Sequence, residues 1–349
     1  MKIFHKLTLI LLSLLILTLA IPEPKVNLTT IPCTNTEKPF KVGVLLGYTT
    51  AYLLSSFQED LKKIESVNSS VVDFIFFDAQ SNQNIQNEQL NSVLTENKVD
   101  LIVLHLVDPR NTKYAVDKIK SHNIPVAFIG YASIAEVNTY NKAYFVTTNP
   151  EQGGNMQGQI LVDAWNKSRG MIDSNRDNIM QYILLLGDPS NVYSDLRTRS
   201  CLDAINNSNI HTQELASKVC YWREDLANDA VSNFFLQFGN RIEVIIANDD
   251  VMAIGAIKAL QKYGYNAGNK MSNISVVGFD GVPEAIELIE KGDMTGTVVQ
   301  DTAYVADNIF KITINMLNNR NPVEGTDCTI GPLGNIISIP NRGVIFSST

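Results

Sequence analysis

A regular alternation of short apolar runs and amphipathic stretches begins near residue 40 and limits the folds open to this chain. The apolar runs have the length of strands and lack a polar face, which indicates strands buried on both sides. Up to residue 131 the strand segments are 40–48, 71–79, 99–107 and 124–131, and the helix segments are 55–66, 84–97 and 112–123. This pattern predicts an α/β fold in which helices cover both faces of a parallel sheet.

The same alternation starts again after the segment 140–150. Its strand segments are 181–188, 212–222, 242–249 and 274–281, and its helix segments are 197–208, 223–240, 250–265 and 283–292. Two similar α/β units in tandem, with no Ser/Gly linker between them, predict a protein of two lobes with a cleft between them. Ligands of open parallel sheets bind at the carboxyl ends of the strands, so we expect the cleft residues to follow these strands directly.

The composition narrows the class of function. The chain has 349 residues, enough for two domains that each bury a core, and its formal net charge is −8. It has no dense Lys/Arg run, so nucleic acid and anionic membrane surfaces are poor candidate partners. It also contains no P-loop, HExxH or nucleophile-elbow motif, and the glycine cluster at 153–158 lacks dinucleotide spacing. We therefore do not expect an enzyme.

Residues 1–22 have the pattern of an export signal. Two lysines precede an uncharged apolar run from Leu7 to Pro22, and small residues lead to a cleavage point at Ala20. The run is longer than many signal cores but short for a membrane span, so a cleaved signal peptide and an uncleaved anchor both stay open. With residues 23–39 as a linker, both alternatives place the protein in the periplasm or at the outer face of the cytoplasmic membrane.

The cysteines are Cys33, Cys201, Cys220 and Cys328. An even number of cysteines in an exported chain permits disulfides, whose pairing the sequence leaves open. Cys33 does not follow the apolar run directly, so we expect no lipid attachment there. The spacing contains no CxxC and the chain has only four histidines, which argues against a zinc site. Cys201 lies on the apolar face of its helix segment and is expected to be a core residue.

The segment 173–181, DSNRDNIMQ, carries part of a cation-binding pattern. Asp173, Asn175 and Asp177 fall at positions 1, 3 and 5 of a calcium loop, which supply alternate oxygen ligands. Position 12, where an EF-hand carries a bidentate Glu, is Leu184. The residues alone leave two interpretations open: a polar turn held by Asx hydrogen bonds, or a calcium loop whose missing carboxylate comes from elsewhere in the chain.

Several motifs spread along the chain resemble one family. They are VGVLLGYTTAYLLSSF, FFDAQSNQNIQNEQLNSVL, HLVDP, NIPVAFIG, YNKAYFVTTNPEQGGNMQGQ, the 173–181 loop, RIEVIIANDDVMAIGAIKAL, VVGFDGVPEAIELIEKGDMTGTVVQD and VEGTDCTIG. From about Phe40 to Arg342 the chain resembles the galactose/glucose-binding proteins of bacterial ABC transport and chemotaxis. The resemblance implies the periplasmic-binding protein type I fold, in which two Rossmann-like lobes with parallel sheets are joined by a hinge of three strands.

The resemblance also implies how the chain divides between the lobes. The N-terminal lobe would comprise 40–149 and 300–336, and the C-terminal lobe, with the calcium site, would comprise 150–299 and 337–349. The chain would return to the first lobe after about Val299 and cross once more near Ile337.

The family closes its calcium loop with a distant Glu. A doubly wound strand order of 2-1-3-4 places the first and third strands of the second lobe side by side, so Glu243, which begins the third, lies beside the loop that feeds the first. The resemblance therefore implies a structural calcium ion, and its ligands would be Asp173, Asn175, Asp177, the carbonyl of Ile179, Gln181 and Glu243.

The resemblance implies a sugar site that is kept in part. Trp222 matches the aromatic residue that stacks on the sugar ring, which presents a patch of C–H groups on each face. Arg197 and Asp280 match the family's arginine and its hydroxyl-binding carboxylate. Asp249 and Gln300 stand where the family has Asn, and the change at Asp249 keeps an acceptor but removes a donor. A structural ion pair between Arg197 and Asp280 is the alternative role for these two residues.

Other positions depart from the family. Ala51 and Leu53 replace an acid and a second aromatic residue, Gly130 replaces Asn, Asn191 replaces His and Tyr193 replaces Asp. The first lobe has therefore lost the family's polar contacts and aromatic lid at these positions. Asn191 and Tyr193 remain candidate ligand contacts, and Tyr48, Tyr131 or Tyr193 could fill the vacated space. Because a site with changed hydrogen-bonding groups rejects its former ligand, galactose and glucose are not assumed.

Two functional hypotheses follow from the resemblance. The first is an exported, monomeric solute-binding protein that closes its lobes on a small sugar or glycoside and delivers it to an ABC-type membrane permease. The second is a membrane-anchored sugar-sensing subunit that signals to a chemoreceptor or histidine kinase. The related transcription repressors share the fold, but they carry a DNA-binding segment where this chain has its export signal.

Overall fold

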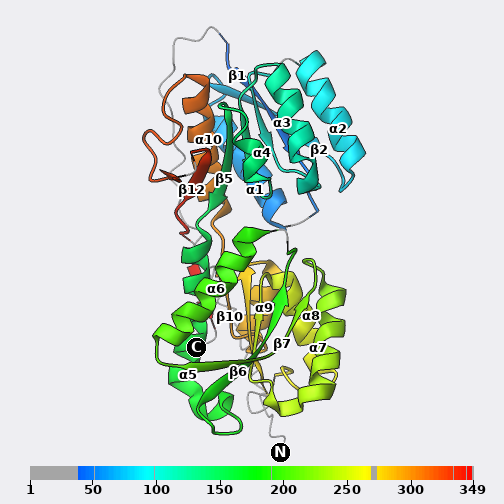
Figure 1. Cartoon of the computed structure of the whole chain (residues 1–349), viewed down its shortest axis with the longest axis vertical. Helices are drawn as coiled ribbons and strands as arrows, with labels where there is room; N and C mark the ends of the chain where they lie inside the picture. The colour runs from blue at the N-terminus through cyan, green and yellow to red at the C-terminus, as the bar shows by residue number, and fades with distance from the viewer. Residues whose placement is uncertain are drawn as a thin grey trace, which may run out of the picture.

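The computed structural model describes residues 38–50, 52–97, 99–189, 191–268, 273–332, 334–342 and 344–347, and these form two α/β lobes (Figure 1). The expected export segment 1–22, the linker up to residue 37, Cys33 and Ala51 lie outside the described residues. Within the described part of the chain, no helix combines the length and the apolar character needed to cross a bilayer.

The first lobe contains a 7-stranded sheet with the order β11-β12-β5-β4-β3-β1-β2. Neighbouring strands are parallel, except that β11 is antiparallel to β12. The strands are β1 (Phe40–Leu46), β2 (Val72–Asp78), β3 (Leu101–Leu104), β4 (Val126–Ile129), β5 (Ala143–Thr148), β11 (Thr329–Ile330) and β12 (Ile336–Ile339). The helices are α1 (Tyr52–Val67), α2 (Gln83–Ser92), η1 (Val93–Asn97), η2 (Pro109–Asn111), α3 (Thr112–Ser121), α4 (Ile134–Val137) and α10 (Thr302–Leu317). The predicted parallel α/β architecture is confirmed.

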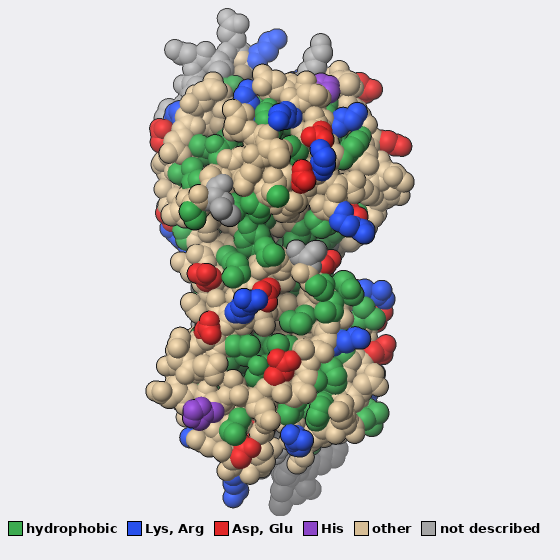
Figure 2. All heavy atoms as spheres, in the orientation of Figure 1, with side chains coloured by type: hydrophobic (Ala, Val, Ile, Leu, Met, Phe, Trp, Pro, Cys, Tyr) green, Lys and Arg blue, Asp and Glu red, His purple; other side chains and the backbone are tan. Residues whose placement is uncertain are grey.

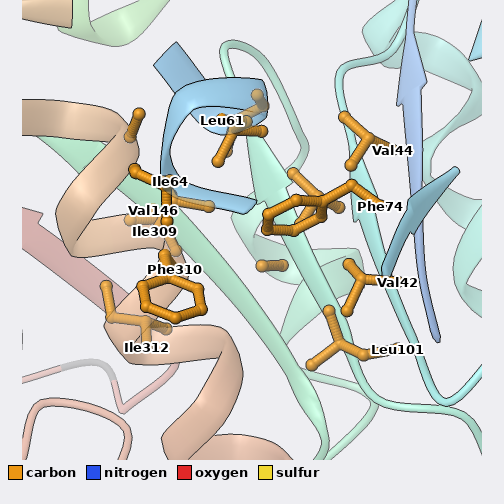
Figure 3. Packing of buried hydrophobic residues seen from close by; sticks show 14 of the residues in the cluster. Val42, Val44, Leu61, Ile64, Phe74, Leu101, Val146, Ile309, Phe310 and Ile312 are labelled. Atoms are coloured by element: carbon orange, nitrogen blue, oxygen red, sulfur yellow. The ribbon is translucent and has the colours of Figure 1, made fainter. Parts of the chain in front are cut away.

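Both faces of this sheet are buried, as strands without a polar face require. On β1, Val44 packs into the core that involves α1 and α10, while Leu45 packs into the core that involves α2 and α3. Figure 3 shows the first of these cores, where Ile309 and Phe310 of α10 lie near Leu61 of α1. Burying each such side chain contributes about 1.5–3 kcal/mol, so a helix from late in the chain helps to hold the first lobe together.

The second lobe contains a 6-stranded sheet with the order β13-β10-β9-β8-β6-β7. Its strands are β6 (Ile179–Leu186), β7 (His211–Val219), β8 (Val244–Ala247), β9 (Ser275–Asp280), β10 (Gly296–Val299) and β13 (Val344–Ser347). Its helices are α5 (Pro150–Ile172), α6 (Val192–Asn207), α7 (Glu224–Phe238), η3 (Gly239–Arg241), α8 (Asp250–Gln261) and α9 (Pro283–Lys291). The run β7-β6-β8-β9 is the expected order 2-1-3-4, and β6 pairs with β8 in parallel.

Both faces of the second sheet are buried at its central strands, whereas the edge strand β7 is exposed or half-buried along its whole length and so departs from the expected burial on both sides. Leu184 of β6 packs into the core that involves α5 and α6, and Leu185 packs into the core that involves α7 and α8. Cys201 of α6 is fully buried in the first of these cores, as expected for a core residue. Within the described part of the chain, Cys201, Cys220 and Cys328 are all buried free thiols.

The chain passes between the lobes three times, after β5, after β10 and after β12. The third crossing was expected near Ile337. Ile337 instead pairs with Val146 of β5, because the segment Ile336–Ile339 extends the parallel sheet of the first lobe. The expected boundary at 336/337 is therefore wrong, and the crossing lies between Ile339 and Val344.

Candidate functional site between the lobes

A cavity of about 1020 Å³ lies at the carboxyl ends of the strands and is lined by residues of both lobes. The molecule narrows between the two lobes, where this cavity lies (Figure 2). The expectation that cleft residues follow the strands holds for Tyr48 after β1, His105 after β3, Tyr131 after β4, Trp222 after β7, Asp249 after β8, Asp280 at the end of β9 and Gln300 after β10. The structure brings all the residues predicted to contact the ligand into this lining: Asn191, Tyr193, Arg197, Trp222, Asp249, Asp280 and Gln300.

Trp222 faces an aromatic residue of the opposite lobe. It follows β7 through a left-handed turn, in which Tyr221 has φ 51° and Trp222 has φ 62°. The indole lies against Gly187, where a Cβ would overlap the ring. Its other neighbour is Tyr131 of the first lobe, whose ring centroid lies 6.3 Å away at an interplanar angle of 25°. Tyr131 therefore gives the first lobe an aromatic ring opposite Trp222 in the cleft.

The first lobe contributes an aromatic wall. The ring of His105 lies between those of Tyr48 and Tyr131, at centroid distances of 5.4 and 6.4 Å. Burial lowers the pKa of His105 to about 4, so the imidazole is neutral at physiological pH. Gly130, in the place of an Asn, has φ 75°, and a Cβ there would overlap the His105 ring. Sequence reasoning did not identify His105, although its position directly after β3 was a usable signal.

Arg197 reaches the cavity from α6. Its Nη2 donates to the carbonyl of Asn248 at 2.6 Å, and its guanidinium lies 4.0 Å from the ring centroid of Phe279. Its Nε is buried and has no hydrogen-bond partner among the described residues. Within that part of the chain Arg197 forms no ion pair, so the structure does not support a structural pair with Asp280. Only one of the five N–H donors of the guanidinium thus bonds to a described residue, and the others are left for a ligand.

Two carboxylates face the cavity from the second lobe. Asp249 caps α8, and its Oδ1 accepts from the Met252 N–H at 2.8 Å. Asp280 has φ 121°, and its Oδ1 accepts from Gln300 Nε2 at 2.7 Å. Burial raises the pKa of Asp249 to about 7 and raises the pKa of Asp280 well above its usual range, with the charge of Asp249 adding to the effect on Asp280. Each carboxylate thus uses one oxygen in a hydrogen bond within the protein.

Asn191 and Tyr193 line the cavity, and the side chain of each already contacts other residues of the protein. The Oδ1 of Asn191 accepts from the N–H groups of Tyr193 and Ser194 at 3.0 and 3.3 Å, which caps α6. The Tyr193 ring lies 5.2 Å from the ring of Phe145 on β5 of the first lobe. Tyr193 therefore links the lobes, and no described residue accepts a hydrogen bond from the Asn191 amide N–H groups.

The predicted calcium loop lies at the opposite, amino edge of the second sheet, between α5 and β6. Glu243 is buried and reaches the loop, as the neighbouring positions of β6 and β8 predicted. Its Oε1 accepts from the Ser174 N–H at 2.8 Å, and its Oε2 accepts from the Gln181 N–H at 3.0 Å. Burial raises the pKa of Glu243, and the nearby charges of Asp173 and Asp177 add to this effect.

The other side chains of the loop bond to one another. Asn175 Nδ2 donates to Asp177 Oδ2 at 2.9 Å and to Gln181 Oε1 at 3.0 Å, and Gln181 Nε2 donates to Asp177 Oδ2 at 2.7 Å. Asp173 Oδ1 is buried and has no hydrogen-bond partner among the described residues. Among the residues that the structure describes, no group of three or more His, Cys, Asp or Glu side chains is arranged to hold a metal ion. The loop therefore contains oxygen ligands suited to calcium, but their arrangement is that of a hydrogen-bonded turn.

Comparisons with known proteins give the family. Residues 42–321 match the family described as "Periplasmic binding protein domain". The D-galactose/methyl-galactoside binding periplasmic protein MglB of Haemophilus influenzae is 30% identical over 306 residues, which cover 87% of this chain and 89% of that protein. The xylitol-binding protein of Mycolicibacterium smegmatis is 23% identical over 256 residues, which cover 72% of this chain and 66% of that protein.

Solved structures show the same fold. An ABC transporter periplasmic solute-binding protein of Actinobacillus succinogenes with bound D-allose aligns with a TM-score of 0.71 at 20% identity, over 89% of this chain and 98% of that chain. A solute-binding protein of Bacillus halodurans with bound myo-inositol aligns with a TM-score of 0.67 at 21% identity, over 90% of this chain and 96% of that chain. The chain belongs to the type I periplasmic-binding family of sugar-binding proteins.

Proposed function

We propose that this protein is an exported solute-binding protein that encloses a small carbohydrate between its lobes and presents it to an ABC-type membrane permease. The observation that carries the proposal is the lining of the interlobe cavity, where an indole, a guanidinium and two carboxylates from different strand ends meet. A sugar ring needs an aromatic surface for its C–H face and charged or polar groups around its rim, and this lining contains both.

Binding to a panel of mono- and disaccharides tests the proposal. We expect at least one sugar to bind in isothermal titration calorimetry, and we expect Trp222→Ala to weaken that binding by about 2 kcal/mol or more, as for a buried aromatic anchor. Leu236→Ala is the matched control, because Leu236 belongs to the same lobe and is 74% exposed. Tight binding that is indifferent to Trp222 would move the site elsewhere, and a panel without any binder would overturn carbohydrate binding.

We also propose that the 173–181 loop binds calcium together with Glu243. The ligands would be the side chains of Asp173, Asn175, Asp177, Gln181 and Glu243 and the carbonyl of Ile179. Support comes from the buried Asp173 Oδ1, which has no hydrogen-bond partner among the described residues, and from the charges of Asp173 and Asp177, which add to the effect of burial in raising the pKa of Glu243. A bound divalent cation would offset this repulsion and join α5 to β6 and β8.

A sensing role is the second candidate function. It is favoured by the apolar run from Leu7 to Pro22, which as an uncleaved anchor would hold the lobes beside a membrane partner such as a chemoreceptor or histidine kinase. Closure of the lobes changes the surface that either kind of partner contacts, so the binding site itself is compatible with both roles.

A further inference from the structure

The interlobe cavity has an uneven distribution of charge. Within the described part of its lining, the first lobe contributes no charged side chain, because its residues are aromatic, aliphatic or hydroxylated and His105 is neutral. All the charge comes from the second lobe. There the carboxyl groups are those of the buried Asp249 and the half-buried Asp280, with the buried Asp250 behind them, and the cation is the half-buried Arg197.

The other charged residues in and around the cavity do not offset its acidic groups. Asp250 accepts from the Gly281 and Val282 N–H groups and from Thr297 Oγ1, and has no cation beside it. At the rim, Glu224 and Glu284 share one cation, Lys258, at 2.9 and 3.0 Å.

Arg223 at the same rim is already paired with Asp225. Arg197 donates to a carbonyl and stacks on Phe279, and no carboxylate in the described chain pairs with it. The cavity therefore has more carboxyl groups than cations, all of them on the side of the second lobe. A cation bound beside Asp249 and Asp280 would lower their raised pKa values and favour their ionised forms.

The carboxylates in the cavity each keep an oxygen for a ligand. Asp249 Oδ1 caps α8 and Asp280 Oδ1 accepts from Gln300, while no protein donor among the described residues bonds to the second oxygen of either group. Helix capping alone does not explain why residue 249 is an acid, because Asn caps a helix as well as Asp does. An ionised carboxylate in a buried site needs a partner, since its desolvation is unfavourable unless it is paired.

The wall opposite the carboxylates suits a cation. Tyr48 and Tyr131 of the first lobe lie at the cavity, and Trp222 faces Tyr131 from the second lobe. The faces of such rings attract an ammonium group by about 0.5–2 kcal/mol, most strongly when the group is desolvated. Anionic sugars are disfavoured by the same arrangement, because inside the cavity they would face the carboxyl groups of Asp249 and Asp280, with only the Arg197 guanidinium to offset them.

We propose that the ligand is an amino sugar, a small sugar whose protonated amine lies between the carboxylates of Asp249 and Asp280 and the aromatic rings of Tyr131 and Trp222. The inference rests on the proposed carbohydrate-binding function and assigns the chemical class of its ligand. The hydroxyls of such a ligand would use Arg197, Gln300 and the free amide of Asn191, and its ammonium group would supply the positive charge that the cavity lacks.

The test is calorimetric titration of the full mature protein with matched pairs of sugars: D-galactosamine, D-glucosamine and D-mannosamine against D-galactose, D-glucose and D-mannose. We expect at least one amino sugar to bind about tenfold or more tightly than its neutral parent at pH 7. Its N-acetyl derivative, which has no charge at that position, should lose this advantage.

Asp249→Asn assigns the preference to the carboxylate. The variant keeps the helix cap and the shape of the side chain, so we expect it to fold and to bind amino and neutral sugars with affinities within about threefold of each other. Glu287→Gln is the matched control, since it removes a carboxylate from an exposed position of α9 in the same lobe and should keep the preference.

The outcomes separate the two proposals. Neutral sugars that bind as tightly as their amino counterparts would overturn the amino-sugar inference and leave carbohydrate binding intact. A preference for amino sugars that survives Asp249→Asn and Asp280→Asn would also overturn it. If neither class of sugar binds, the proposed function fails together with the inference.

Discussion

The rings of Tyr131 and Trp222, which come from different lobes, lie with their centroids 6.3 Å apart and at an interplanar angle of 25°. Tyr131 follows β4 and Trp222 follows β7. The two rings meet because the carboxyl edges of both sheets face the same cavity. A ligand that enters the cavity must therefore change the surroundings of the Trp222 indole.

This relationship predicts a fluorescence signal for binding. The chain has two tryptophans, Trp165 in the core of the second lobe and Trp222 in the cavity. We expect a sugar that binds in the calorimetric panel to change the intrinsic fluorescence of the wild-type protein. Trp222→Phe should abolish the change, whereas Trp165→Phe should retain it. A change that persists in Trp222→Phe would mean that the signal comes from outside the cavity.

Calcium should stabilise the protein if the 173–181 loop binds it. A ligand that binds only the folded state adds about 2.7 kcal/mol at a concentration one hundredfold above its Kd. Chelation should therefore lower the midpoint of thermal unfolding by several degrees, on the order of 2–4 °C per kcal/mol for a chain of this size class. Differential scanning calorimetry with and without chelator measures this shift.

The variant Glu243→Gln gives the control for the calcium prediction. It should remove the response to calcium, and Glu287→Gln, which changes an exposed carboxylate of the same lobe, should keep it. Magnesium should have a smaller effect, since it requires a tighter octahedral site. An unfolding midpoint that is insensitive to chelator in the wild-type protein would leave the loop as a hydrogen-bonded turn.

Asp249→Asn should make the ligand-free protein more stable at alkaline pH. Burial raises the folded-state pKa of Asp249 to about 7, above the value of about 3.9 in an unfolded chain. The stability from this raised pKa is fully present below pH 4 and is lost as the pH rises through 7. The ionisable groups that interact electrostatically with Asp249 are Arg197, Cys220, Asp250, Asp280, Tyr48 and Tyr131.

Asn cannot ionise, so the variant should gain on the order of 1 kcal/mol over wild type at pH 8 and little at pH 5. Urea denaturation at the two pH values measures the difference. Equal effects of the substitution at pH 5 and pH 8 would contradict the assignment of this pH dependence to Asp249.

The amino terminus separates the transport and sensing roles. Cleavage at Ala20 would produce a protein that begins at Ile21 and diffuses freely, whereas an uncleaved run would retain it at the membrane. Mass spectrometry of the protein from its native cells measures which form exists. A terminal peptide beginning at Ile21 would exclude the anchored sensor, and an intact segment in the membrane fraction would exclude the diffusing protein.

The sequence was sufficient to predict the two α/β lobes and the strands that border the cavity. The run 244–247 is apolar throughout and has polar residues on both sides, so its burial on both faces and the polar residues at its ends could be inferred from pattern alone. Asp249 and Asp280 were expected at the cavity because of the family resemblance and because they lie at strand ends, and the structure places them in its lining. The pairing of β6 with β8, which brings Glu243 to its loop, followed from strand order.

Other features depend on contacts between distant segments. Helix α5 contains several glycines and has low helix propensity in isolation, so its helical form reflects packing against α6. The extension of the first sheet by Ile337 depends on pairing with Val146, which no local pattern signals. Tyr131 was one of three tyrosines considered for the vacated space, and only the fold distinguishes their positions: Tyr131 faces Trp222, and Tyr193 packs against Phe145.

The three crossings between the lobes have a consequence for export. The first lobe requires α10 and β12, which are synthesised after the whole of the second-lobe segment 150–299. Thr302 at the start of α10, for example, donates to Asp60 of α1 at 2.8 Å, and Phe310 fills the core beside α1. A chain that emerges from its amino end therefore has no complete lobe to fold until nearly all of it has been made. Because folding is delayed, an exported chain would stay unfolded while it passes through a translocation pore. The same arrangement means that truncation near the carboxyl terminus would damage the lobe that begins at the amino terminus.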